Sequence, residues 1–480
     1  MDRTVKDRVG PPAAGRAVMD RSRPPEPGPI RTFEFPPVEQ RTLPNGLTLL
    51  TAHSGDLPLV TVRAVLDAGA TAERAGEEGL AQLTTQALEG GTLHRTGDEL
   101  AWAVERLGAE LETHTTWDAV HVAFTTRSDN LADALALLAE IVTTPGFPAR
   151  EVDRLRDEQL AEMLRRRTEP RGLADDSAAH FIFADDSTYA RPLIGLEPRV
   201  RGFSRDDVVA WHQRQFTPGN AAIIVVGRVD PDEAESHVQR AFGDWTGVSQ
   251  PTPGALAGAR SDRAAIHVVD RASAVQSELR IGHVGVPRHH EDYYTLLVLN
   301  GIIAGAFTSR LNLSLREKHG FTYGVRSAFA FRRAAGPFLI QTAVASDVTA
   351  RAVEETLREL HSIRDEGVTD EEVSAARDFI AGTLPLELQT TAQLSSRLAE
   401  IHTFGLGTDY FEGYRRHIAA VTRDDVMRAA RTHVRPDALA IVIVGNADVV
   451  VDDLKKLDAG DVVRHNAGDS HASDTPDVAS

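Results

Sequence analysis

Two nearly continuous runs of apolar residues stand out along the chain, at Ile223–Val226 and Ile441–Val444. Each run follows a turn that contains proline, and before the turn comes a segment that opens with Ser204 or Thr422 and has two aspartates in its first turn. A hydroxyl residue followed by acidic residues is typical of a helix N-terminus. A short apolar run bounded by turn residues is typical of a strand that is buried on both faces. The pattern therefore predicts a helix, a turn and a central strand, and predicts them twice.

The two regions are copies of one another. Residues 204–230 and 422–448 align without a gap at a constant offset of 218. Identical residues stand at the aligned positions Arg205/Arg423, Asp206/Asp424, Asp207/Asp425, Val208/Val426, Pro218/Pro436, Gly227/Gly445 and Asp230/Asp448. Agreement over so many positions indicates an internal duplication, so we expect two homologous halves.

Composition marks the boundaries of these halves. Pro, Gly, Ser and Ala are concentrated at 247–263, which predicts a linker between a first half at 37–246 and a second half at 264–457. Residues 1–36 are rich in Pro, Arg and Asp, and residues 458–480 in Asp, Ser, His and Ala. Because neither end has a periodic apolar face, we expect a disordered N-terminal extension and a disordered tail.

Each half combines strands with long helices. The predicted strands are Val60–Leu66, Ala119–Thr125, Ala265–Val269, Glu278–Val284, Tyr323–Phe331 and Pro337–Val344, and the predicted helices include Asn130–Val142, Glu151–Arg166 and Tyr293–Ala304. Strands that are adjacent in sequence, with helices grouped after them, indicate an α+β fold rather than a doubly wound α/β fold. We expect each half to form an antiparallel-rich sheet packed with helices.

Composition also narrows the classes of function. The 480 residues carry 70 acidic and 52 basic side chains, and the resulting net charge of -18 argues against nucleic-acid binding, which needs a basic surface. The absence of cysteine excludes disulfide scaffolds, Cys-ligated zinc, iron–sulfur clusters and thiol nucleophiles. No uninterrupted apolar window is long enough to predict a transmembrane helix. The N-terminus has no secretory h-region, so we expect a cytoplasmic protein, or a periplasmic one if the start is wrongly assigned.

The histidines give little support for a metal site. The densest cluster, His289–Asp292, stands at a helix start, where adjacent side chains diverge, and it fits a solvated N-terminus. His114 and His121 lie on strands that could pair as a hairpin, without a cluster of carboxylates nearby. The chain also lacks the phosphate-binding loop, the dinucleotide fingerprint, the nucleophile elbow and HExxH.

Several short segments together form a recognisable pattern. They are LPNGL at Leu43–Leu47, AGATAE and Gly79-Leu80-Ala81 within 68–92, Gly91-Thr92, and SRL, LREK and TY within 307–329. With the duplication and the linker, this pattern resembles the M16 metallopeptidases of the pitrilysin and mitochondrial processing peptidase type, in particular the bacterial branch in which two subunits share one site. The resemblance covers nearly all of 37–450 and implies two homologous α+β halves of the LuxS/MPP-like fold.

The zinc motif of this family is degenerate here. Active members carry HxxEH directly after Gly-Leu-Ala, in which two histidines bind zinc and the glutamate activates the bound water. In this chain Gln82 and Gln86 stand at the ligand positions and Thr85 at the position of the base. An amide oxygen is a poor zinc ligand, and threonine is no base near neutral pH. Glu162 stands at about the spacing of the family's third ligand, where it could also simply face solvent, but one carboxylate cannot hold catalytic zinc. We therefore expect no zinc or other cofactor in this chain.

The family's second-half signature is retained. An arginine and a tyrosine with six residues between them bind the substrate backbone and stabilise the reacting carbonyl in the family, and Arg316 and Tyr323 match them. Without the resemblance, a surface arginine and a half-buried tyrosine would be the expected reading. With it, we expect a proteolytically silent subunit that supplies both residues to the zinc site of a homologous HxxEH-bearing partner, in a heterodimer or larger complex that cleaves peptides or unfolded segments.

Three alternatives remain at this point. The chain could be a structural scaffold, like the core proteins of respiratory complexes that share this fold, although a scaffold needs neither Arg316 nor Tyr323. It could be a peptide-binding protein that captures peptides without cleavage. It could also be an independent hydrolase with another site, for which the sequence offers no constellation.

Overall fold

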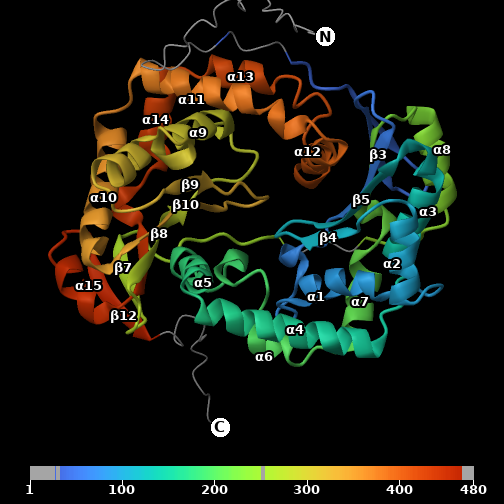
Figure 1. The fold of residues 1–480 in the computed structure, drawn as a ribbon, viewed down its shortest axis with the longest axis horizontal. Coiled ribbons are helices and arrows are strands. Elements are labelled where there is room, and N and C mark those ends of the chain that lie inside the picture. The colour runs from blue at the N-terminus through green and yellow to red at the C-terminus, as the bar shows by residue number, and fades with distance from the viewer. Residues whose placement is uncertain (1–27, 29–32, 250–253, 467–480) are drawn as a thin grey trace, which may run out of the picture. The chain divides into compact units, whose positions relative to one another are not determined.

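Two six-stranded sheets, one in each half of the chain, form the framework of the protein (Figure 1). A computed structural model describes Gly28 and residues 33–249 and 254–466. The first sheet runs in the order β1 (Val38–Thr42), β2 (Thr48–His53), β6 (Ala221–Gly227), β3 (Leu59–Leu66), β5 (Val120–Arg127) and β4 (Glu112–Thr115). The second runs in the order β12 (Asp461–Asn466), β7 (Ala265–Asp270), β11 (Ala440–Gly445), β8 (Gln276–Val284), β10 (Pro337–Ala345) and β9 (Arg326–Phe329). The fold is α+β, as the sequence predicts.

Helices alternate with groups of strands along both halves. In the first half they are α1 (Leu80–Ala87), α2 (Gly97–Arg106), α3 (Leu131–Thr143), α4 (Ala149–Thr168), α5 (Pro170–Ile182), α6 (Glu197–Val200), α7 (Arg205–Gln215) and α8 (Pro231–Phe242). In the second half they are α9 (Tyr293–Asn300), α10 (Thr349–Asp365), α11 (Asp370–Thr383), α12 (Thr391–Phe404), α13 (Tyr414–Ala420), α14 (Arg423–His433) and α15 (Ala447–Leu454). Two π-helical segments, η6 (Gly301–Gly305) and η7 (Asn312–Lys318), lie between α9 and β9.

The strand pairing confirms the internal duplication. In the first sheet β6 is parallel to β2 and antiparallel to β3, which is antiparallel to β5. In the second sheet β11, β7, β8 and β10 repeat these relationships. The strands β6 and β11 contain the two apolar runs, and every residue in them is buried. The preceding helices, α7 and α14, begin with capping boxes at Ser204 and Thr422, as their sequences predict.

The outermost strands, β1 and β12, differ between the two copies. Two predictions about the ends of the chain are also wrong in part. The prediction of a disordered tail over 458–480 is wrong for β12, which pairs with β7. Its side chains are mostly exposed, so no apolar period marks it, although Val462 packs against the second-half core and Arg464 pairs with Asp270. The prediction of a disordered extension over 1–36 is wrong at Phe35, which is buried and stacks on Phe411 with ring centroids 5.2 Å apart. The other residues of both predicted ends lie largely outside the described residues.

Each half lends one helix to the sheet of the other half. The first-half helix α5 packs on β8 and β11, and the second-half helix α12 packs on β3 and β6. Phe181 of α5 lies in one hydrophobic cluster with Val442 of β11. Under α12, the buried Arg63 of β3 donates a hydrogen bond of 3.0 Å to the Ser395 hydroxyl. Each sheet therefore depends in part on the other half for its cover.

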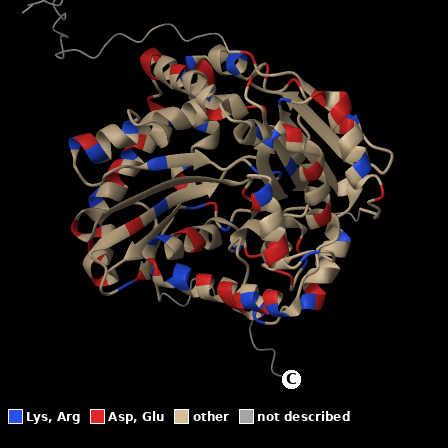
Figure 2. Ribbon diagram, turned by 45° about the vertical axis from the view of Figure 1, so that its right-hand side comes forward, with Lys and Arg blue, Asp and Glu red and all other residues tan. Residues whose placement is uncertain are grey.

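Charged side chains of both signs are interspersed along the helices (Figure 2). On α4, Arg165 pairs with Glu162 and Glu169, each at 2.6 Å, one turn away on either side. Such pairs belong to a solvated helix face. Within the described ranges no helix has the length and apolar character that crossing a membrane requires.

Candidate functional site

The segment at the position of the zinc motif forms the short helix α1, which packs against α4, α7 and β4. Gly79 precedes the helix with φ +103°, a left-handed conformation that favours glycine. A Cβ atom at this position would lie 2.7 Å from the carbonyl oxygen of Ile194. The glycine therefore allows both the turn and the close approach of a second segment.

Thr85 is committed to structural hydrogen bonds. Its side chain is buried, and its hydroxyl donates to the Ala81 carbonyl at 2.8 Å while it accepts from the Thr115 hydroxyl of β4, also at 2.8 Å. A neutral hydroxyl whose proton is already donated within the helix is in no position to accept one from water. The expectation that Thr85 cannot replace a catalytic glutamate agrees with this geometry.

Gln82 and Gln86 lie one helical turn apart on α1, so their side chains share a face. Both are partly buried, and neither side chain forms a hydrogen bond within the described part of the chain. Two amides and a threonine offer neither imidazole nor carboxylate, so the residues present at this position do not fit zinc.

Glu162 lies on α4, the helix that packs beside α1. Its carboxylate is bound by Arg165, and this hydrogen bond lowers the pKa of Glu162. The α4 residue that reaches α1 is Gln159, one turn earlier, whose buried Nε2 donates to the carbonyl oxygens of Gly79 at 3.1 Å and Ile194 at 2.8 Å. In the sequence, Gln159 is marked only as a polar residue on the otherwise apolar face of α4.

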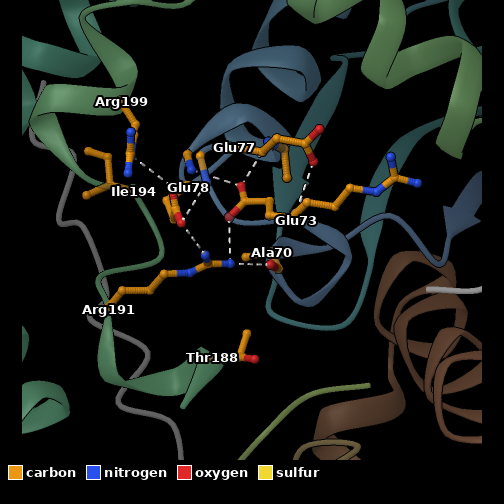
Figure 3. Close-up of polar contacts among 12 residues, drawn as sticks. Ala70, Glu73, Glu77, Glu78, Thr188, Arg191, Ile194 and Arg199 are labelled. Atoms are coloured by element: carbon orange, nitrogen blue, oxygen red, sulfur yellow. Dashed lines mark hydrogen bonds and ion pairs between the residues drawn. The ribbon is translucent and has the colours of Figure 1, made fainter. Parts of the chain in front are cut away.

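A buried carboxylate anchors the N-terminus of α1 (Figure 3). Glu73 Oε1 accepts hydrogen bonds from the main-chain N–H groups of Gly79 and Ala81, each at 3.0 Å. Its other oxygen lies 2.8 Å from Arg191, which also donates to the Ala70 carbonyl at 2.7 Å. Burial raises the pKa of Glu73 to about 8, while Arg191 and the two N–H groups act in the opposite direction. The network fixes the place of α1 even though the zinc ligands are absent from it.

Among the described residues, one group of three potential metal ligands lies together, in the second half. Ligand atoms of His290, Asp292 and His433 lie within 4.8 Å of one another. Arg428 donates to both carboxylate oxygens of Asp292, and His433 Nε2 lies 2.8 Å from the same carboxylate. The Arg428 guanidinium lowers the pKa of Asp292 to about 2. Because a cation already occupies the carboxylate, we assign the group as an ion-pair network that joins the start of α9 to α14.

His114 and His121 are paired across the β4–β5 hairpin, as their strands predict. Their rings stack with centroids 4.4 Å apart. Burial lowers the pKa of both histidines and so favours the neutral form of each ring.

Arg316 lies in η7, a π-helical segment. Segments of π-helix are rare and occur frequently at functional sites. The guanidinium lies 3.9 Å from the centroid of the Phe307 ring, and Phe307 itself is 66% exposed. Nη1 lies 3.0 Å from a Glu317 carboxylate oxygen, yet within the described chain this buried nitrogen has no acceptor aligned for a hydrogen bond. The Arg316 side chain as a whole is 29% exposed and forms no hydrogen bond within the described part of the chain.

Tyr323 lies in the loop between η7 and β9, and its side chain is 99% exposed. The prediction of a strand over Tyr323–Phe331 is wrong at both ends, because β9 begins only at Arg326 and ends at Phe329. In the described part of the chain, Tyr323 forms no side-chain hydrogen bond or ring contact. It is therefore not the half-buried tyrosine that ordinary strand packing would give.

Two family models match the chain, one in each half. "Insulinase (Peptidase family M16)" matches residues 48–195, and "Peptidase M16 inactive domain" matches residues 202–379. An uncharacterised zinc protease from Streptomyces coelicolor is 24% identical over 82% of this chain and 86% of its own length. Another from Mycobacterium leprae is 26% identical over 74% of this chain and 80% of its own length.

Solved structures of similar fold cover most of the chain. A peptidase M16 inactive domain from Pseudomonas fluorescens has a TM-score of 0.79 at 25% identity and covers 85% of this chain and 98% of its own. A protease from Helicobacter pylori has the same TM-score at 18% identity, over 85% of this chain and 100% of its own. A chain of complex III from Candida albicans has a TM-score of 0.74 at 17% identity, over 88% and 98%. With two M16 models on consecutive parts of the chain and this fold around them, the protein belongs to the M16 peptidase family.

Proposed function

We propose that the chain is a zinc-less subunit of a heteromeric M16 endopeptidase and that it supplies Arg316 and Tyr323 to the zinc site of a homologous HxxEH-bearing subunit. The observation that carries the proposal is the contrast between the two positions. Thr85, at the position of the catalytic glutamate, is buried and its hydroxyl makes two structural hydrogen bonds. Tyr323, in contrast, is 99% exposed and does not pack against the rest of the described chain. An exposed tyrosine offers a ligand both an apolar ring and a phenolic hydrogen-bond donor.

In this role the two residues bind the backbone of an extended peptide. The Arg316 guanidinium donates hydrogen bonds to a peptide carbonyl, and the Tyr323 phenol adds a neutral donor beside it. Donors aimed at an oxygen that gains negative charge during attack contribute about 10²–10³-fold each to the rate. The zinc and the attacking water belong to the partner subunit, and no step is assigned to Gln82, Thr85 or Gln86.

A peptide-binding protein without cleavage would use the same two residues, so it is the second candidate function. A scaffold, the remaining alternative, is disfavoured because it has no use for an exposed Tyr323 or for an Arg316 side chain without a hydrogen bond in the described chain. The fold shared with a complex III chain at 17% identity bears on architecture alone.

One experiment separates these functions. The chain is purified alone and together with the product of an adjacent M16 gene that carries HxxEH, and zinc content and cleavage of a quenched fluorescent peptide are measured. We expect zinc and activity only in the complex. Activity with stoichiometric zinc from this chain alone would overturn the proposal, and a robust complex without activity would support the scaffold.

Variants of the complex test the two residues directly. Arg316→Ala and Tyr323→Phe should each reduce kcat/KM by about 10²-fold, with association unchanged in gel filtration. Arg351→Ala is a matched control, because Arg351 also stacks on an aromatic ring, that of Phe321 at 5.1 Å, in the same half. Turnover as high in Arg316→Ala as in Arg351→Ala would remove Arg316 from the mechanism.

A further inference from the structure

One buried side chain connects the segments that carry Arg316 and Tyr323. Asn312 is the first residue of η7, four residues before Arg316, and it is 5% exposed. Its Nδ2 donates to the Val325 carbonyl at 3.0 Å, and its Oδ1 accepts from the Val325 N–H at 3.2 Å. Because Val325 is two residues after Tyr323, this pair of hydrogen bonds fixes the loop of Tyr323 to the helix of Arg316.

The same amide also reaches a third segment. Nδ2 lies 3.2 Å from the carbonyl oxygen of Ala306 and 3.1 Å from the Ser309 hydroxyl. Ala306 directly precedes Phe307, the ring on which the Arg316 guanidinium rests. Asn312 therefore joins the segment of Phe307, the helix of Arg316 and the loop of Tyr323 through one side chain.

The Tyr323 loop has a second attachment on β10. The Thr342 hydroxyl lies 2.9 Å from Thr322 Oγ1 and 3.0 Å from the carbonyl oxygen of Gly324. The residues on both sides of Tyr323 are thus tied to the sheet, and Val325 is tied to Asn312. The main chain is held at this point while the Tyr323 side chain stays in solvent, which is the arrangement of a preorganised ligand contact.

We propose that Asn312 is the positioning residue of the Arg316/Tyr323 site, and this inference rests on the proposed function of those two residues. A side-chain amide presents a donor and an acceptor side by side, so it satisfies both main-chain groups of Val325 at once. A carboxylate lacks the donor, and an apolar residue leaves both groups buried without partners. Asn312 touches no substrate in this assignment and acts only through Arg316 and Tyr323.

Peptide binding by the full chain tests the inference. Wild type, Asn312→Ala, Arg316→Ala and Tyr323→Phe are titrated against a fluorescein-labelled unstructured peptide, and anisotropy is measured. We expect Asn312→Ala to weaken binding about tenfold, as the loss of one aligned charge-assisted hydrogen bond would. The matched control is Ser314→Ala, which removes a different buried polar group of η7, a hydroxyl that donates to Glu355 on α10 at 3.0 Å, and which should bind as wild type does.

A double-mutant cycle distinguishes positioning from general destabilisation. In a chain that already carries Arg316→Ala and Tyr323→Phe, Asn312→Ala should cause no further loss of affinity, because its effect passes through the two residues removed. An additive loss there would overturn the inference. So would wild-type affinity in the single Asn312→Ala variant when Arg316→Ala and Tyr323→Phe both weaken binding. If Arg316→Ala and Tyr323→Phe both leave binding unchanged, the proposed function of these two residues is wrong. The positioning role of Asn312, which depends on that function, is then wrong as well.

Hydrogen exchange supplies a readout that does not depend on any ligand. The Val325 N–H should exchange faster in Asn312→Ala than in Ser314→Ala, in samples of both variants that remain folded by near-UV circular dichroism. If Asn312→Ala fails to fold, Asn312→Leu serves in its place, since it is close to asparagine in size and removes both the acceptor for the Val325 N–H and the donor to the Val325 carbonyl. Unchanged exchange at Val325 in a folded variant would contradict the inference.

Discussion

The main-chain N–H of Arg333 donates a hydrogen bond of 3.1 Å to the carboxylate of Asp118. The two residues occupy equivalent places in the duplicated halves, because Asp118 lies in the turn between β4 and β5 and Arg333 in the turn between β9 and β10. The Arg333 guanidinium also pairs with Asp67, directly after β3, and the neighbouring Arg332 lies over the Trp117 ring at 4.7 Å. The two hairpins thus meet one another, and Arg333 of one half binds two carboxylates of the other, Asp118 through its main-chain N–H and Asp67 through its guanidinium.

Arg333→Ala should destabilise the whole unit. The substitution leaves the partly buried Asp67 without its cation, and loss of a hydrogen bond to a charged group costs about 1.5–3 kcal/mol. The expected result is a lower urea midpoint with an unchanged m-value. Arg127→Ala is the control, because its pair with Asp129 is exposed and should not shift the midpoint measurably. Equal midpoints for both variants would show that the hairpin contact adds nothing to stability.

Neither half should fold well by itself. Without α12, the face of β3 and β6 is uncovered, and the buried Arg63 loses its partners Ser395 and Ser396. We expect residues 34–246 expressed alone to aggregate or to unfold without cooperativity, and co-expression with residues 254–480 to yield a soluble pair. Gel filtration and near-UV circular dichroism measure this. A monomeric first half with a cooperative transition would contradict the expectation.

Strands and helices can be predicted from the sequence where their burial requires a regular pattern of apolar residues. The strands β6 and β11 are buried on both faces, so their apolar runs are unmistakable, and the capping boxes at Ser204 and Thr422 are local. Strand β12 lacks such a pattern because it lies at the edge of its sheet with most of its side chains exposed, so its burial imposes no run of apolar residues.

The candidate site is predictable residue by residue but not in its geometry. Gln82, Thr85, Gln86, Arg316 and Tyr323 are found by their place in short motifs. Their supporting contacts join residues that are distant in sequence or unremarkable by type, and no local period marks them. The amide of Asn312 and the hydroxyl of Thr342 hold the Tyr323 loop out of the strand, which is why the predicted start of β9 is wrong, and Gln159 and Arg191 support α1 in the same unmarked way.

Acid should destabilise the protein through buried histidines. Burial lowers the pKa of His212 and of His283 from 6.5 to about 4, so between these values the unfolded chain binds protons that the folded chain does not. Stability is therefore complete above about pH 6.5 and falls as the pH drops toward 4, by about 1.4 kcal/mol per pH unit for each histidine. Urea unfolding at a series of pH values measures this slope. His212→Gln should make the slope shallower, and a slope that is unchanged would exclude His212 as a source.

Restoring the two histidines should restore zinc binding. In the variant with Gln82→His and Gln86→His, the imidazoles would stand one turn apart on α1, a helix already held in place by Glu73 and Gln159. Glu162, on the neighbouring α4, would provide the third ligand once it leaves Arg165. We expect about one zinc per chain after dialysis, measured by plasma mass spectrometry, weaker binding when Glu162→Gln is added, and tighter binding when Arg165→Ala is added. A folded variant that binds no zinc would show that α1 and α4 no longer hold the geometry of a metal site, and that the site has been lost in its backbone as well as in its side chains.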